Sequence, residues 1–260
     1  MTMLIPLQPG AGSPGDPNSV LGKVRLILES FTADSDELSL TDLVRRSGVP
    51  KASVHRLAAE LVEWGLLERA GTRYRLGLRL FELGQIVPRQ RILREAVLPY
   101  MQDVIAATGE TIHFAIRESL DVMYVEKIVG HSGLREESRV AGRMPLHSTA
   151  TGKAILAFSP PSVLEDVLSH GLAPVTRYTT TAPGVLRMQL DRIRREGIAL
   201  ESEETRLGYM SLAVPVFGRR SALVGALSVT APTTRMHEAR FTGALRAAAS
   251  GVTRALRALP

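Results

Sequence analysis

The amino-acid sequence predicts an α+β protein of two domains, a small helical domain that ends in a hairpin and a larger antiparallel sheet flanked by helices. Three observations support this prediction. The chain has 260 residues, a length that suits two domains of ordinary size. Three helical patterns precede two short strand patterns near the N-terminus. Farther on, strands are followed by helices and then by strands again, an order typical of α+β domains.

Composition sets the general class of protein. Hydrophobic residues make up 45% of the chain and charged residues 22%, as in ordinary globular proteins. The lack of cysteine excludes disulfide scaffolds, thiol catalysis and Cys-ligated zinc. No apolar run approaches the roughly 18 residues of a membrane span. We therefore expect a soluble, cytoplasmic protein without a membrane partner.

The first domain follows a short N-terminal arm. Residues 1–18 are rich in proline and glycine and lack the apolar core of a signal peptide, so they predict a disordered arm. Apolar residues at helical spacing, a Ser47-Gly48 stop and an Ala70-Gly71 turn then define the elements. The predicted elements are helices over residues 20–31, 40–47 and 51–64 and strands over residues 66–69 and 72–76.

Charge is distributed unevenly along this domain. Residues 45–79 contain eight basic and three acidic residues, a net charge of +5, whereas residues 16–44 have a net charge of −4. Three helices with a tight turn between the second and third, followed by a hairpin, form the pattern of a winged helix-turn-helix. Because the basic stretch falls on the third helix and the hairpin, we expect binding to double-stranded DNA. A helical domain that binds protein is the alternative interpretation.

A linker connects the two domains. Residues 78–86 continue a helical pattern, residues 87–89 predict a break, and a longer helix is expected over residues 90–107. We place the boundary near Pro88. The predicted organisation is an arm over residues 1–18, a DNA-binding domain over residues 19–88, and a linker helix with an effector domain over residues 89–260.

The second domain alternates between strands and helices. Its last helix has an apolar face through Phe241, Leu245 and Val252, which indicates packing against a sheet. The predicted elements are strands over residues 111–117, 121–128 and 136–141, helices over residues 148–158, 160–169 and 183–196, strands over residues 198–202, 212–217 and 223–230, and a helix over residues 237–259.

One segment of this domain suggests a ligand site. Residues 143–153 place hydroxyls and small residues before a helix, and the first N–H groups of a helix bind anions. An ordinary Ser/Thr cap is the structural alternative. The polar stretch 201–208 suits a loop that lines a cavity, and Ser228 and Thr230 alternate on an apolar strand. The histidines lack metal-binding spacing, so we expect neither metal nor cofactor.

Several motifs resemble those of the IclR family of bacterial transcription regulators. The motifs that carry this resemblance are LSLTDL (38–43), GVPKASVHRL (48–57), YRLG (74–77), GET (109–111), PLHSTATGKA (145–154) and LVGALSV (223–229). Their order and spacing cover nearly the whole chain. The resemblance implies a winged helix-turn-helix, a linker helix and a GAF-like effector domain. It also implies dimers that pair as tetramers and bind promoter DNA.

The resemblance also assigns site residues. The expected DNA-binding residues are Arg45, which lies in the basic stretch, together with Lys51, Ser53, His55, Arg56 and Arg73. The expected effector-binding residues are His113, Leu146, Thr149, Ala150, Thr151, Gly152, Glu201, Tyr209, Ser211, Ser228 and Thr230. Ser211 stands where some family members have cysteine, which favours a pocket of hydroxyls and backbone N–H groups.

The sequence therefore predicts a ligand-responsive regulator rather than an enzyme. The family includes repressors and activators; we expect a repressor that responds to a small organic acid, either a carboxylate or an aromatic catabolite. The alternative is a hydrolase or transferase with a DNA-binding appendage. Its candidate groups, His147, Ser148 and Glu201, lack a recognisable nucleophile–base arrangement.

Overall fold

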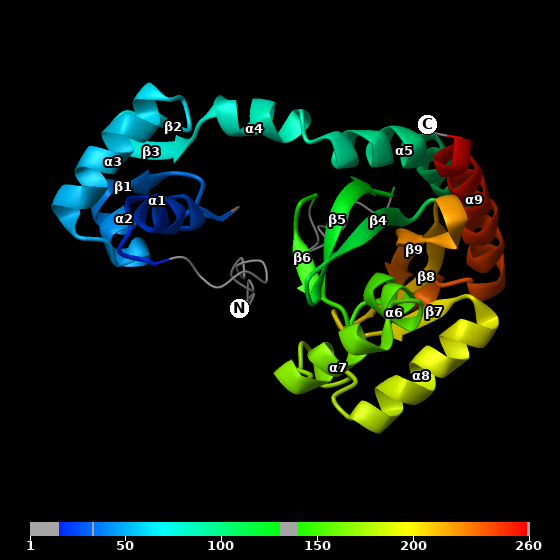
Figure 1. The fold of residues 1–260 in the computed structure, drawn as a ribbon. Helices are drawn as coiled ribbons and strands as arrows, with labels where there is room; N and C mark the ends of the chain where they lie inside the picture. The colour runs from blue at the N-terminus through cyan, green and yellow to red at the C-terminus, as the bar shows by residue number, and fades with distance from the viewer. Residues whose placement is uncertain (1–15, 33, 131–139, 259–260) are drawn as a thin grey trace. The chain divides into compact units, whose positions relative to one another are not determined.

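The computed structural model describes residues 16–32, 34–130 and 140–258 (Figure 1). The residues up to Arg91 and the residues from Ile92 onward form two compact units, which are described one at a time. The predicted arm falls mostly outside the described residues. Along the described chain, no helix is long and apolar enough to cross a membrane.

The N-terminal unit contains three packed helices and a small sheet, followed by a fourth helix. Its sheet has the strand order β1-β3-β2, with both pairings antiparallel. The elements are α1 (Val20–Glu29), β1 (Leu38–Ser39), α2 (Leu40–Ser47), α3 (Lys51–Glu63), β2 (Leu67–Ala70), β3 (Arg73–Leu76) and α4 (Leu78–Gln85). The helices and the hairpin lie within a few residues of their predicted positions. The two-residue strand β1 was not predicted, because it is too short to show alternation.

Local signals fix the turn between α2 and α3. Ser39 caps α2 in a capping box with Asp42, in which each side chain bonds the other residue's backbone N–H. Gly48 ends α2 in the left-handed conformation, with φ of 67°, which glycine adopts without steric cost. A core that includes Ile27, Leu43 and Leu57 then holds the three helices together.

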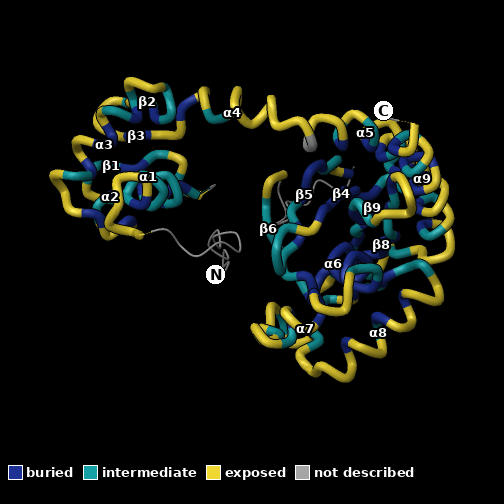
Figure 2. Tube along the Cα trace, in the orientation of Figure 1, coloured by how far each residue is buried: buried dark blue, intermediate teal, exposed yellow. Residues whose placement is uncertain are grey.

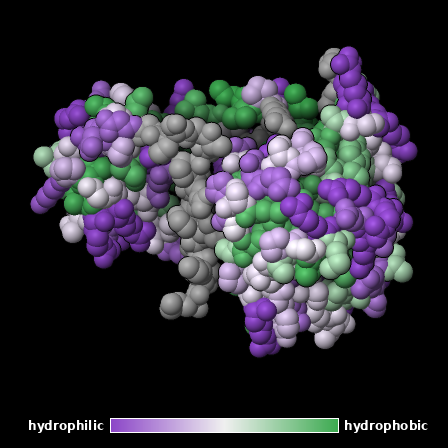
Figure 3. All heavy atoms as spheres, turned by 60° about the horizontal axis from the view of Figure 1, so that its bottom comes forward, coloured by the Kyte–Doolittle hydropathy of each residue, from purple (hydrophilic) through white to green (hydrophobic). Residues whose placement is uncertain are grey.

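Helix α4 differs from the other helices of this unit. None of its side chains is buried, and Leu78 and Phe81 are 63% and 62% exposed. Figure 2 shows α4 as an exposed segment, and Figure 3 shows hydrophobic surface along it. Helix α5 (Pro88–Thr108) begins within the predicted break, because proline suits the first turn of a helix.

The C-terminal unit contains a six-stranded antiparallel sheet. The strand order is β6-β5-β4-β9-β8-β7. The strands are β4 (Thr111–Glu118), β5 (Asp121–Ile128), β6 (Arg143–Pro145), β7 (Ala199–Ser202), β8 (Tyr209–Phe217) and β9 (Leu223–Pro232). The helices are α6 (Ala150–Ala157), α7 (Pro161–His170), α8 (Pro183–Glu196) and α9 (Glu238–Ala258), with short 3₁₀ turns η1 (Arg219–Ser221) and η2 (Thr233–Arg235).

Helices cover both faces of this sheet. Phe114, Leu227 and their neighbours pack against α5 and α9 in one core. Ala115, Ala226 and other small residues face a second core that contains α6 and α8 (Figures 1 and 2). Successive residues of a strand point to opposite faces, so β4 and β9 supply large apolar residues to one face and small or polar residues to the other.

The sequence prediction was wrong for one edge of the sheet. We expected a strand over residues 136–141, of which residues 136–139 lie outside the described residues. Val140 and Ala141 form a turn, and the edge strand is β6, which pairs with β5 through Val122 and Met144. Strand β6 has only three residues, Arg143–Pro145, which is too short to show the alternation of a strand.

Candidate functional site

The first candidate site is the outer face of α3. Val54, Leu57 and Leu61 are buried, whereas Lys51, His55 and Arg56 are exposed and Ser53 is half-buried. The helix starts after Pro50 without a side-chain cap, so its first N–H groups remain available to a phosphate oxygen. The polar face at this helix start has the donors that a recognition helix needs in the major groove.

The arginines around α3 form weak pairs at the surface. Arg56 contacts Glu60 at 2.5 Å and Arg45 contacts Asp42 at 2.9 Å. Arg73, at the hairpin, donates to the Glu37 carbonyl at 3.2 Å. Exposed ion pairs contribute little free energy, so these guanidinium groups can exchange their partners for phosphates at small cost.

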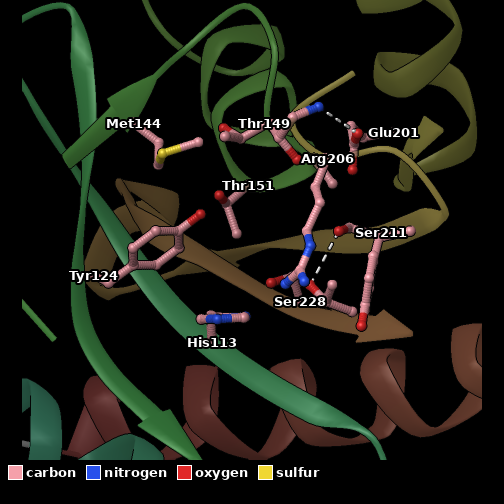
Figure 4. A pocket seen from close by; sticks show the side chains of 13 residues that line it. His113, Tyr124, Met144, Thr149, Thr151, Glu201, Arg206, Ser211 and Ser228 are labelled. Carbon is pink, nitrogen blue, oxygen red and sulfur yellow. Dashed lines mark hydrogen bonds between the residues drawn. The ribbon is translucent and has the colours of Figure 1, made fainter. Parts of the chain in front are cut away.

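The second candidate site is a pocket on the α6 face of the C-terminal sheet (Figure 4). Its volume is about 60 Å³, while one water needs roughly 10–15 Å³ on the same scale. It therefore has room for several waters or a small organic molecule. Its lining residues are His113, Tyr124, Met144, Thr149, Ala150, Thr151, Glu201, Thr205, Arg206, Tyr209, Ser211, Ser228 and Thr230.

The register of the sheet brings the polar floor together. Glu201 on β7 is opposite Ser211 on β8, and Ser211 is opposite Thr230 on β9. The Ser211 and Thr230 hydroxyls are 3.0 Å apart. In the next row of the same face, Ser228 is opposite His113 on β4. Four strands thus bring hydroxyl, imidazole and carboxyl groups together on one patch. More than a hundred residues of sequence separate the first of these groups from the last.

Most of the effector residues expected from the sequence line this pocket, but two do not. Leu146 is fully buried in the core beneath α6. Gly152 lies where there is no room for a side chain, because a Cβ there would lie 2.3 Å from the Leu146 carbonyl oxygen. The sequence analysis did not name Tyr124, Met144, Thr205 or Arg206, although the last two lie in the stretch 201–208 that it expected to line a cavity. Of these, Tyr124 stacks beside His113, with ring centroids 4.9 Å apart.

The start of α6 is capped by its own side chain. Thr149 Oγ1 accepts from the Gly152 N–H at 2.9 Å and donates to the Pro145 carbonyl at 3.1 Å. This is the ordinary N-cap that we had considered as the structural alternative. The cap gives the Gly152 N–H a hydrogen-bond partner. The residues of α6 that line the pocket are therefore Ala150 and Thr151.

One wall of the pocket is the segment 203–208 between β7 and β8, here called the strap. Thr205 and Arg206 line the pocket from it. The Arg206 guanidinium lies over the Tyr209 ring at 4.4 Å, and its side chain extends toward Ser211 and Ser228 (Figure 4). A cation thus reaches the polar floor of the pocket.

A buried carboxyl group anchors the strap. Glu201 is 1% exposed, and its Oε1 accepts from the N–H groups of Glu204 at 2.5 Å and Thr205 at 3.0 Å. Burial raises the pKa of Glu201 to about 7, against the effect of these hydrogen bonds. Near neutral pH, Glu201 is therefore a mixture of acid and carboxylate.

Beneath the strap lies a fully buried charge, Lys153. Its Nζ forms an ion pair with Glu204 Oε1. Glu204 Oε2 also accepts from the Thr180 N–H at 3.0 Å, and its carbonyl accepts from Thr179 Oγ1 at 2.7 Å. Burial lowers the pKa of Lys153, although Glu204 opposes that shift. Glu204 thus joins the strap to α6 and to the loop before α8.

The groups considered for hydrolysis are not arranged for it. His147 Nε2 lies 3.0 Å from the Ala173 carbonyl, and Ser148 Oγ is buried with no hydrogen-bond partner within the described part of the chain. A serine nucleophile requires a base within hydrogen-bond reach, and His147 is not bonded to Ser148. In residues 16–32, 34–130 and 140–258, no group of three His, Asp or Glu side chains gathers as a metal site.

Comparison with known proteins agrees with this geometry. The IclR helix-turn-helix domain model matches residues 20–71, and the bacterial transcriptional regulator IclR C-terminal model matches residues 85–254. The regulator XynR of Escherichia coli is 31% identical over 88% of this chain and 94% of its own. The transcriptional repressor IclR of Escherichia coli is 26% identical, covering 83% of this chain and 81% of its own.

A solved structure shows the same fold. It is an IclR homolog from Microbacterium hydrocarbonoxydans complexed with 4-hydroxybenzoate, 33% identical, with a TM-score of 0.87 over 93% of this chain and 100% of that one. The protein is thus a DNA-binding transcriptional regulator and not an enzyme. The chain belongs to the IclR family. The predicted fold class and the family resemblance are both confirmed.

Proposed function

We propose that this regulator binds promoter DNA through α3 and the β2–β3 hairpin, and that a small carboxylate in the pocket controls its affinity for DNA. Benzoates are the preferred members of this class. The protein acts as a repressor in the bacterial cytoplasm, where it associates with the nucleoid through its DNA. Residues 19–88 serve as the DNA-binding part and residues 89–260 as the linker and effector part.

The observation that carries the effector class is the placement of Arg206. Its guanidinium reaches a pocket floor made of hydroxyl groups, and guanidinium groups bind carboxylates through paired, charge-assisted hydrogen bonds. The rings of His113 and Tyr124, tilted by 43° to one another, add aromatic surface that a ligand ring can contact. The 4-hydroxybenzoate in the related structure has both a carboxylate and a ring, which supports this choice.

The proposed repressor role rests on relatives and on thermodynamic linkage. A related protein is named as a transcriptional repressor. An effector releases a repressor from DNA only if it binds the DNA-free conformation more tightly. The proposed DNA contacts are Arg45, Lys51, Ser53, His55, Arg56 and Arg73, while Leu146 and Gly152 support the pocket from behind.

We also propose that the protein forms dimers that pair as tetramers. The support is α4 and the residue that follows it, since Leu78, Phe81 and Ile86 are each more than 60% exposed. Contiguous apolar surface of this kind marks an interface. Sedimentation velocity should show a dimer or a dimer of dimers. A monomer at micromolar concentration would contradict this part of the proposal.

The central test uses the full chain and an operator selected from a random duplex library. Binding of fluorescent operator is measured at fixed salt, with and without 4-hydroxybenzoate. We expect a weaker operator affinity with the ligand, and no such change for Arg206→Gln. The proposal fails if 4-hydroxybenzoate, benzoate and acetate bind the chain but leave operator affinity unchanged.

A further inference from the structure

Glu201 presents a charge problem for the proposed ligand. A carboxylate held near Arg206 would share the pocket with the carboxyl group of Glu201, which also lines it. Two like charges at short range repel, and the repulsion is stronger in a partly buried pocket than in bulk water. The pocket can hold a carboxylate ligand without this cost if Glu201 is neutral.

We propose that Glu201 binds the effector as a neutral carboxylic acid, so that each bound carboxylate is accompanied by uptake of one proton. This inference rests on the proposed function and names how that same site is regulated. A protonated carboxyl group has one O–H donor in addition to its acceptor oxygens. It therefore adds a hydrogen bond to an anionic ligand where an ionised Glu201 would repel it.

The hydrogen bonds of Glu201 are compatible with the neutral form. Its Oε1 is occupied by the two strap N–H groups, and a carbonyl oxygen accepts such bonds as a carboxylate oxygen does. The proton can then reside on Oε2. The side chain is 1% exposed, so little water stabilises the ionised form.

The neighbouring groups act on the charge of Glu201 in both directions. On the strap, Glu204 repels the ionised form, whereas Arg206, which reaches into the same pocket, and the hydrogen bond with Ser211 favour it. Lys153 on α6 is paired with Glu204. His113 on β4 and Tyr209 on β8 line the pocket. His147 lies before α6 beside the Lys153–Glu204 pair. The buried residues of α8 are apolar: Leu186, Leu190 and Ile193. The buried cation Lys153 thus has Glu204 as its ion-pair partner.

Calorimetry can count the proton directly. Titration of the full chain with 4-hydroxybenzoate in two buffers of different ionisation enthalpy reports the protons taken up per ligand. We expect uptake of about half a proton near pH 7, increasing toward one near pH 8. Over about pH 6 to pH 8, the Kd should increase roughly tenfold, because the fraction of neutral Glu201 falls.

Two variants and a matched ligand isolate the group. Glu201→Gln should bind 4-hydroxybenzoate with a Kd that is independent of pH and without proton uptake. Glu165 is an exposed carboxyl of α7 that pairs with Arg187. The control variant Glu165→Gln should keep the wild-type pH dependence of the Kd and of proton uptake. The neutral 4-hydroxybenzamide should show no proton uptake. If Glu201→Gln fails to fold, wild-type calorimetry still tests the inference, because carboxylate binding without proton uptake overturns it.

The outcomes separate the inference from the proposed function. Tight carboxylate binding without proton uptake would overturn the inference and leave the effector class standing. Proton uptake that persists in Glu201→Gln would assign the proton to another group, such as His113, and would also overturn it. If no carboxylate binds while operator binding is intact, the proposed effector class fails and the inference fails with it.

Discussion

Lys153 and Glu204 form an ion pair that is closed off from solvent inside the C-terminal unit, with Lys153 at 0% exposure. The pair joins the first turn of α6 to the strap, and both elements line the pocket. A buried pair of this kind does not add much net stability over apolar residues, but its geometry is costly to disturb. It therefore fixes the position of Thr205 and Arg206 relative to Thr151.

Breaking this pair should destabilise the C-terminal unit. Lys153→Met leaves the Glu204 carboxylate buried without a counter-charge, so the free energy of unfolding should fall by about 3–5 kcal/mol. Urea unfolding monitored by circular dichroism measures this change. Adding Glu204→Gln removes the unpaired charge and should recover part of the loss. An exposed-pair control, Arg187→Met, should change stability by less than about 1 kcal/mol; an equally small effect of Lys153→Met would contradict the prediction.

The titration of Glu201 should make stability depend on pH. Its pKa is about 7 in the folded chain against 4.5 for an ordinary glutamate, so the folded state binds the proton more tightly. The protonated group then contributes roughly 3 kcal/mol to the free energy of unfolding. This contribution is fully present below about pH 4.5 and is lost as the pH rises through about 7.

Glu201→Gln isolates this contribution, because the amide cannot ionise. The wild type should lose roughly 3 kcal/mol of stability relative to the variant as the pH rises from about 4.5 to about 8. The free energy of unfolding is measured in urea across this range without ligand. Parallel pH profiles for the two proteins would show that Glu201 has an ordinary pKa.

The DNA contacts of α3 can be tested through salt dependence. Arg56→Ala should weaken operator binding and reduce the slope of log affinity against log salt by about 0.9, the value for one lost phosphate contact. Arg187→Ala, on the exposed surface of the C-terminal unit, removes the same charge outside the proposed DNA-binding unit and should leave the slope unchanged. Equal slopes for wild type and Arg56→Ala would place this arginine outside the DNA interface.

The glycine in the first turn of α6 is required by close packing. Gly152→Ala would place its Cβ 2.3 Å from the Leu146 carbonyl oxygen and 2.5 Å from Thr149 Oγ1. We expect a loss of about 1–3 kcal/mol in the free energy of unfolding and a displaced cap on α6. Gly243→Ala, at an open position within α9, should instead stabilise by about 0.5–1 kcal/mol. Thermal unfolding should show a lower Tm than wild type for Gly152→Ala and a higher Tm for Gly243→Ala.

The sequence predicts the elements of this fold better than it predicts the pocket. Helices α2, α3 and α8 follow from apolar spacing and from glycine stops, which are local signals. Ser228 and Thr230 were identified because they interrupt an apolar strand. Arg206 was missed because the strap has no periodicity, so its sequence does not show which side chain turns inward.

Tyr124 and Met144 were missed for a different reason. Tyr124 alternates with apolar residues and resembles a core position, and a register shift at Phe114 and Ala115 decides what it faces. Met144 lies on β6, which was itself unpredicted. Which residues meet in a pocket depends on strand register and on loop paths, and these are set by contacts between distant parts of the chain.

The two faces of the C-terminal sheet have a consequence for how such regulators diversify. Along β4 and β9, residues that hold the sheet to α5 and α9, such as Phe114 and Leu227, alternate with residues that line the pocket, such as His113 and Ser228. A substitution at one position of the second kind leaves the first kind untouched. The lining of the pocket and the packing of the sheet are therefore nearly independent, and selection can alter the first while retaining the second.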